Sequence, residues 1–173
     1  MLEMLGVGPR DVLVDLGCGD GRVVVKAAKR GARSVCVEID RVLCNVTEIW
    51  ARVEGVEDRV EVICKSFFDV DLGSVNPTIV YAYLYPSVLE QLSPKLEDEL
   101  SDGTIIVTLD FAIRGWSPVY ARVLVDENKF DRVLWMYVTG LSNPKARRVG
   151  IAKNLGLFVS RLRSRSLRGV SNA

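Results

Sequence analysis

The segment VDLGCGDGR at residues 14–22 constrains the fold of this chain more than any other feature. The apolar run Val12–Leu16 has the composition of a buried strand. Three glycines follow at alternate positions in residues 17–21, and a helical segment opens at Arg22. Glycines allow a tight turn and let a ligand approach the backbone where a Cβ would clash. The pattern therefore predicts a strand, a glycine-rich binding loop and a helix.

Two acidic residues complete the pattern of a cofactor site. Asp15 lies at the end of the first predicted strand, and Glu38 ends the second, SVCVEID, where a carboxylate can accept both hydroxyls of a ribose. This arrangement is typical of S-adenosylmethionine-dependent methyltransferases. Ser66 and Phe67 follow the third predicted strand, where this fold meets the adenine. The residues predicted to bind S-adenosylmethionine are Asp15, Leu16, Gly17, Cys18, Gly19, Glu38, Ile39, Ser66 and Phe67.

A nicotinamide dinucleotide is the nearest alternative ligand. Its motif is Gly-x-Gly-x-x-Gly, and counting from Gly17 the final position here is Arg22. An arginine at that position hinders close packing of helix on strand. Asp15 also suits the amino group of a methionine moiety better than a pyrophosphate. A glycine turn with a purely structural role is the remaining alternative.

Composition narrows the chemistry further. The chain has 173 residues, of which 49% are hydrophobic, and this suits one domain with a sizeable core. No membrane-spanning run or signal peptide is visible, so we expect a cytoplasmic protein. The absence of histidine excludes histidine general bases and histidine-ligated metals, and we predict no metal site. The four cysteines lack C-x-x-C spacing and are expected to be small buried hydrophobes, not disulfides. A single glutamine and 26% charged residues favour a thermophile.

Predicted strands and helices alternate along most of the chain. The predicted strands are residues 12–16, 34–38, 60–64, 78–81 and 104–109, and the predicted helices are residues 22–29, 41–52 and 88–100. Residues 122–125 and 132–139 follow as two strands whose spacing suits a hairpin. We predict an α/β fold, a Rossmann-like seven-stranded methyltransferase sheet with a C-terminal β-hairpin. In such sheets the ligand binds beyond the carboxyl ends of the strands, where the strand order reverses.

Charge is distributed unevenly along the chain. Residues 145–173 contain eight of the 23 basic residues and no acid, so the remainder carries a net charge of −7. We predict a methyltransferase domain over residues 1–144 and a basic C-terminal tail over residues 145–173. A basic amphipathic helix that binds nucleic acid or an anionic surface is one interpretation of the tail. A disordered or loosely packed tail, which can dock on the acidic body, is the other.

Four segments resemble a known family. VDLGCGDGRVVVKAAKRGA, FFDVDL, LSPKLEDELSDGTIIV and FAIRGWSP are similar to the archaeal broad-specificity protein lysine methyltransferases and, more distantly, to mitochondrial lysine methyltransferases of eukaryotes. The PKLEDEL helix followed by FxIRGW is the most restrictive part. The resemblance implies methyl transfer from S-adenosylmethionine to the side-chain amine of lysines in protein substrates. An RNA or small-molecule methyltransferase and a non-catalytic cofactor-binding scaffold are the alternatives.

The beginning of the chain departs from the family. Family members carry an extra N-terminal segment, with a Thr-Pro pair, that lies over the cofactor. This chain begins within the helix of that segment, at MLEMLGV. The resemblance therefore implies either a cofactor site without this cover or a start further upstream.

The predicted substrate site centres on the YAYLYPS segment after the fourth strand. It replaces the Asn/Asp-Pro-Pro-Tyr motif of enzymes that methylate planar amides and adenine amino groups, which argues against those substrates. Its three alternating tyrosines are expected to share a face, and aromatic ring faces attract ammonium groups. We predict that Tyr83 lines a lysine channel, Asp110 orients the amine and Trp116 forms a wall. Packing of the strand end, helix capping and a place in the core are the alternative roles.

Overall fold

The computed structural model describes residues 1–125 and 128–144, so the predicted basic tail lies outside the described residues. The strands are β1 (Val12–Leu16), β2 (Arg33–Glu38), β3 (Val60–Cys64), β4 (Ile79–Ala82), β5 (Ile105–Leu109), β6 (Tyr120–Val125) and β7 (Asp131–Val138). The helices are α1 (Arg22–Ala28), α2 (Arg41–Val53), the short 3-10 helix η1 (Phe67–Asp69), α3 (Leu72–Val75) and α4 (Pro86–Glu99).

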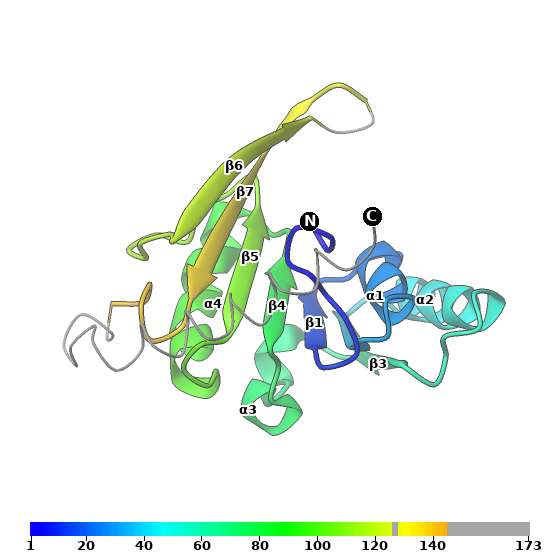
Figure 1. Cartoon of the computed structure of the whole chain (residues 1–173). Coiled ribbons are helices and arrows are strands. Elements are labelled where there is room, and N and C mark those ends of the chain that lie inside the picture. The colour runs from blue at the N-terminus through cyan, green and yellow to red at the C-terminus, as the bar shows by residue number, and fades with distance from the viewer. Residues whose placement is uncertain (126–127, 145–173) are drawn as a thin grey trace.

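The seven strands form one sheet in the order β3-β2-β1-β4-β5-β7-β6 (Figure 1). Strands β1 to β5 are parallel, and β7 pairs antiparallel with both β5 and β6. The predicted seven-stranded sheet with a C-terminal hairpin is confirmed. The strand order reverses at β1, whose two neighbours are β2 and β4. A ligand cleft is therefore expected beyond the carboxyl ends of β1 and β4.

Side chains alternate between two core layers, one on each face of the sheet. On one face Leu13 and Ile79 pack with α1, through Val24 and Val25, and with the N-terminal residue Leu5. On the other face the aliphatic side chains of β1, β2 and β4 pack with α4 and α3. Alternate residues of a strand point to opposite faces, so each buried strand contributes to both layers. This double burial explains why the parallel strands read as continuous apolar runs.

The helix ends follow local sequence signals. Asp40 caps α2 by accepting a hydrogen bond from the Val42 N–H at 2.7 Å. Helix α4 begins at Pro86, two residues before the expected start, because proline is well suited to the first helical position. The short elements η1 and α3, which the sequence analysis did not predict, fill the connection between β3 and β4. Each begins at a side-chain cap, Ser66 and Asp71 respectively.

The prediction of unpaired cysteines was wrong. All four cysteines are paired, as the disulfides Cys18–Cys36 and Cys44–Cys64, with Cα–Cα distances of 5.4 and 6.0 Å. These distances are within the usual range for disulfides. The pairing depends on tertiary structure, because parallel pairing sets Cys36 of β2 beside the end of β1, and α2, which carries Cys44, follows the end of β2 where Glu38 pairs with Cys64. Spacing along the chain does not show which cysteines meet in this way.

No helix among the described residues is long and apolar enough to cross a membrane.

Candidate active site

The glycine loop between β1 and α1 separates into a ligand-facing part and a packing part. Gly17, Gly19 and Gly21 all have positive φ angles, of 77°, 58° and 78°. A Cβ on Gly19 would have no atom within 4 Å, whereas a Cβ on Gly21 would lie 2.5 Å from the Thr47 side chain. Gly21 therefore serves the close packing of α1 against α2. Gly19 instead leaves open space in which a ligand can approach the backbone.

Glu38, at the end of β2, holds the loop in place. Its Oε2 atom accepts a hydrogen bond from the Gly19 N–H at 3.0 Å. Its Oε1 atom accepts from the N–H groups of Ile39 at 2.8 Å and Asp40 at 3.0 Å. A carboxylate offers about four acceptor positions, so capacity remains for a ribose hydroxyl. The side chain predicted to bind ribose thus has a second role, which the sequence analysis missed, as an anchor for the glycine loop.

Asp15, at the end of β1, is a buried carboxyl group with no counter-charge among the described residues. Only 2% of the residue is exposed. Burial, and then the nearby charges of Glu38 and Asp20, raise the pKa of Asp15 to about 8. Within the described residues no donor forms a hydrogen bond with this carboxyl group. A cationic ligand would stabilise its ionised form, and the ammonium of a methionine moiety fits that requirement.

The remaining predicted cofactor residues lie around the same strand ends. Ile39 follows Glu38 and leaves 72% of its surface exposed, so an apolar side chain is available beside the predicted ribose position. Ser66 precedes η1 and accepts a hydrogen bond from the Phe68 N–H at 3.2 Å. The ring centroids of Phe67 and Phe68 are 4.8 Å apart. The side chain of Leu16 is fully buried, so only its backbone can face a ligand.

A second group of polar residues lies where β4 and β5 end and where β7 begins. Asp110, just after β5, forms an ion pair with Arg132 at 3.1 Å, and the Arg132 guanidinium lies 5.0 Å from the ring centroid of Tyr83. Burial raises the pKa of Tyr81 above its usual value, and the charge of Asp15 adds to this effect. The charges of Arg132, Tyr83 and Asp110 also act on Tyr81. Tyr81 therefore lies between the buried acid of β1 and the Asp110–Arg132 ion pair.

Two aromatic residues of the predicted substrate site are placed differently from the expectation. Trp116 is 7% exposed and packs edge-on against Tyr137, with ring centroids 6.0 Å apart, in the core layer of α4, which fits the alternative role of a core residue. The strand alternation expected to align the three tyrosines stops before Tyr83, because β4 ends at Ala82. Tyr85 precedes α4, and its ring centroid lies 6.4 Å from that of Phe111.

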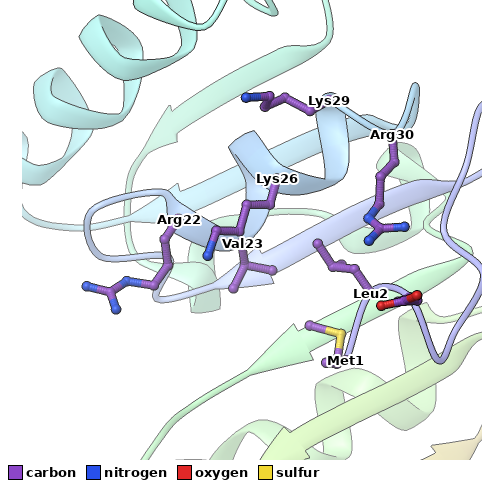
Figure 2. Close-up of a pocket in the computed structure, with 8 residues that line it drawn as sticks. Met1, Leu2, Arg22, Val23, Lys26, Lys29 and Arg30 are labelled. Carbon is purple, nitrogen blue, oxygen red and sulfur yellow. The ribbon is translucent and has the colours of Figure 1, made fainter. Parts of the chain in front are cut away.

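A pocket of about 560 Å³ lies beside α1 but is distinct from the predicted cofactor site (Figure 2). Its lining includes residues 1–3 and the basic side chains Arg22, Lys26, Lys29 and Arg30. Arg22 is paired with Asp20 at 2.7 Å, and Lys29 forms an ion pair with Glu54. No residue predicted to bind the cofactor lines this pocket. In the part of the chain that the structure describes, no group of three potential metal ligands is present either.

A sheet of this order, with an open glycine loop and acids ending β1 and β2, is the architecture of S-adenosylmethionine-dependent methyltransferases. A solved structure described as an RNA methyltransferase from Salinibacter ruber, in complex with S-adenosyl-L-homocysteine, matches with a TM-score of 0.70 and 38% identity. The match covers 79% of this chain and 86% of that one. The protein is thus a methyltransferase whose cofactor is S-adenosylmethionine. The model of the ANTKMT methyltransferase domain matches residues 15–120, and the chain belongs to this family.

Two relatives of known description support the family assignment. A protein-lysine N-methyltransferase of Saccharolobus islandicus is 38% identical over 144 residues, which are 81% of this chain and 86% of that protein. An adenine nucleotide translocase lysine N-methyltransferase of Mus musculus is 34% identical over 140 residues, or 80% of this chain. The aligned region spans 58% of the mouse protein. The resemblance stated from the sequence motifs is therefore confirmed.

Arg132 is the residue at this site that sequence reasoning missed. It lies in the predicted hairpin, two residues before Leu134, which pairs with Leu109 in the sheet. Because β7 returns antiparallel beside β5, its first residues meet the residues that follow β5. An arginine in a hairpin strand carries no local signal of such a contact.

Proposed function

We propose that this methyltransferase acts on the side-chain amine of lysine residues in proteins. The carboxyl end of β4 supports this substrate class. There the half-exposed ring of Tyr83 lies in the segment that replaces the Asn/Asp-Pro-Pro-Tyr motif. The charges of Tyr83 and of Asp15 both raise the pKa of Tyr81, which lies near each of them. The names of the Saccharolobus and mouse relatives point to the same substrate.

In this proposal the cofactor-binding residues fix the position of the methyl group. Asp15 binds the ammonium of the methionine moiety, Glu38 accepts the ribose hydroxyls, and the backbone at Gly17 and Gly19 lies against the cofactor. Ile39 and the loop at Ser66 and Phe67 contact the adenine. S-adenosylmethionine, when bound, supplies an electrophilic methyl group on a sulfonium.

Tyr83 and Asp110 then position the amine of the substrate. With the cofactor bound, the neutral nitrogen would take the methyl group from the sulfonium. A carbon–nitrogen bond would form, the carbon–sulfur bond would break with its electron pair left on sulfur, and the methylated nitrogen would release a proton to solvent. Proximity and alignment supply most of the acceleration in such a reaction, so the absence of histidine is no obstacle.

We further propose an archaeal, thermophilic and cytoplasmic protein whose methyltransferase domain covers residues 1–144. The relative from Saccharolobus islandicus supports the source. The two disulfides support it too, because intracellular disulfides are common in hyperthermophiles and rare in mesophiles. The family match at residues 15–120 lies within the proposed domain.

The substrate class can be tested with labelled S-adenosylmethionine and three acceptors offered in parallel: a protein mixture, total RNA and small amines. We expect label in protein, located on lysine by mass spectrometry, and loss of labelling when the lysines are acetylated beforehand. The Gly19→Val variant serves as a control for cofactor-dependent transfer. Label in RNA alone, the substrate class by which the Salinibacter protein is described, overturns the lysine proposal but leaves the cofactor unchanged.

A further inference from the structure

The guanidinium of Arg132 contacts both side chains, Asp110 and Tyr83, that are predicted to position the amine of the substrate. Arg132 lies 3.1 Å from the Asp110 carboxylate and 5.0 Å from the ring centroid of Tyr83. The side chains of Arg132 and Asp110 are 27% and 20% exposed, so the pair is largely shielded from water but open on one side. An incoming amine at Tyr83 therefore meets a paired carboxylate and a fixed cation.

Strand β7 holds the Asp110 carboxylate so that it faces Arg132. Asp110 has a left-handed backbone conformation with φ 64°, and its N–H donates to the Val133 carbonyl at 2.6 Å. Its Oδ1 atom accepts from the Val133 N–H at 3.2 Å, and its carbonyl accepts from the Trp135 indole N–H at 3.3 Å. These four constraints leave Oδ2 facing Arg132. The ion pair is therefore built into the junction of β5 and β7.

The protonation state of the amine decides whether transfer can occur. A free lysine titrates near ~10.4, so at neutral pH almost all of it is the unreactive ammonium. An unpaired carboxylate beside the amine would favour the ammonium still more, because opposite charge stabilises the charged form. A guanidinium stays protonated at all relevant pH values, and it both neutralises the carboxylate and repels a second cation.

We propose that the Asp110–Arg132 pair keeps the substrate lysine in its neutral, nucleophilic form. Arg132 acts here as a positioning residue for charge, since it cancels the field of Asp110 at the place where the amine binds. This inference rests on the proposed lysine substrate. With Arg132 present, Asp110 and the Tyr83 ring do not stabilise the unreactive ammonium form of the substrate lysine.

The ionisable groups that the structure describes near the pair remain the same in each variant below, and they include Arg122 on β6, two residues before Leu124, the strand partner of Arg132. Asp15 and Tyr81 lie on β1 and β4, and Glu38 and Asp20 act on Asp15. Tyr83 stacks on Arg132 itself. Asp131 precedes Arg132 on β7, where strand alternation directs it to the opposite face. A difference between variants therefore reports on the Asp110–Arg132 pair.

The test compares kcat as a function of pH at saturating cofactor and lysine substrate for three variants. In Arg132→Gln, Asp110 loses its partner, and we expect the rise in kcat to move up by about one pH unit. The rate then falls about tenfold at neutral pH and recovers in alkali. In Asp110→Asn the guanidinium loses the Asp110 carboxylate, so the rise moves to lower pH; asparagine tolerates the positive φ. In the double variant the rise returns to about the pH of the wild type, with a lower kcat because Asp110 also positions the amine.

Matched variants separate charge from structure. Arg132→Lys keeps a cation and is expected to keep the wild-type profile, and Arg52→Gln removes an exposed arginine of α2, paired with Glu48, without effect. Thermal unfolding of every variant reports on folding. Equal losses of kcat at all pH values in both single variants, or unshifted profiles, would overturn the inference while lysine methylation by the wild type stands. A wild-type protein that methylates no lysine overturns the proposed function and this inference together.

Discussion

The Gly19 N–H donates a 3.0 Å hydrogen bond to Oε2 of Glu38, which joins the glycine loop to the end of β2. The same carboxylate accepts two further backbone N–H groups at the start of α2. One side chain therefore fixes the loop, the strand end and the helix start with respect to one another. Glu38 therefore organises the predicted cofactor site through contacts within the protein itself.

Replacing Glu38 with alanine is expected to weaken cofactor binding more than the loss of ribose contacts alone explains. Three backbone N–H groups lose their acceptor, and each buried donor left unpaired costs about 1–3 kcal/mol. We expect affinity for S-adenosylhomocysteine to fall at least about 100-fold in isothermal titration and the free energy of unfolding to fall as well. Glu61→Ala, which removes an exposed acid paired with Arg33, is the control. An unchanged dissociation constant in Glu38→Ala would contradict this role.

Gly19→Val is expected to abolish cofactor binding by filling the open space over the loop. The change also strains the backbone, because φ is +58° there. Gly55→Val is a matched control, since Gly55 has φ +65°, equally open space and a position in the turn after α2. Both variants are expected to lose about 1–3 kcal/mol of stability from strain. Only Gly19→Val is expected to lose the heat of binding, and equal affinities in the two variants would place the cofactor elsewhere.

Cofactor affinity is expected to rise with pH up to about 8 because of Asp15. Its pKa lies near 8 in the folded protein, so below that pH the carboxyl group is neutral and attracts a cation weakly. Binding of the ammonium favours ionisation, so near pH 7 binding should release a proton. Titration calorimetry in buffers of different ionisation enthalpy measures this release. It is expected to disappear in Asp15→Asn, and its persistence there would assign the proton to another group.

The same shift has the opposite effect on the stability of the cofactor-free protein. The folded state keeps its proton on Asp15 up to about pH 8, while the unfolded chain releases it near the ordinary value of 3.8. The unfolded state therefore binds fewer protons between these values, and the contribution of Asp15 to stability falls as pH rises through this window. Urea unfolding of the wild type and of Asp15→Asn across this range measures the difference.

Tyr83→Ala and Trp116→Ala are expected to fail in different ways. Tyr83 is 45% exposed at the strand end, so its loss is expected to lower turnover with little change in stability or cofactor affinity. Trp116 is buried against Tyr137, and its removal is expected to cost about 3–5 kcal/mol of folding free energy. Denaturant unfolding and kcat measured for both variants separate these effects. A stable Trp116→Ala protein with impaired turnover would restore the channel-wall role.

The Cys44–Cys64 disulfide is expected to stabilise the protein without touching cofactor binding. It closes a segment with a sequence separation of 20, for which the chain-entropy model gives about 3 kcal/mol. Cys64→Ser is expected to lower the free energy of unfolding by about 2–4 kcal/mol while affinity for S-adenosylhomocysteine stays constant. The wild type in dithiothreitol is expected to be destabilised too. Free thiols found by titration of the unfolded, unreduced wild type would contradict the pairing.

The sequence alone determined the seven strands, the three longer helices and the cofactor chemistry, but not the short elements η1 and α3. The apolar run before the glycine loop, the loop itself and the acids at Asp15 and Glu38 are local signals, because strand burial and turn geometry depend on neighbours along the chain. The five parallel strands and the hairpin followed from the alternation of apolar and polar segments. Motifs such as FAIRGWSP gave the family, since they preserve several positions at fixed spacing.

Only the tertiary structure decided which side chains meet. The two disulfides and the contact of Arg132 with Asp110 depend on the register of strands distant in the sequence. Tyr83 and Tyr85 have different neighbours, Arg132 and Phe111, and β4 ends at Ala82 before the strand alternation reaches either residue. Trp116 lies in the core because it packs against the ring of Tyr137 of β7, on the face of the sheet that α4 covers. Period and turn residues determine where elements form, but packing and register determine the contacts between them.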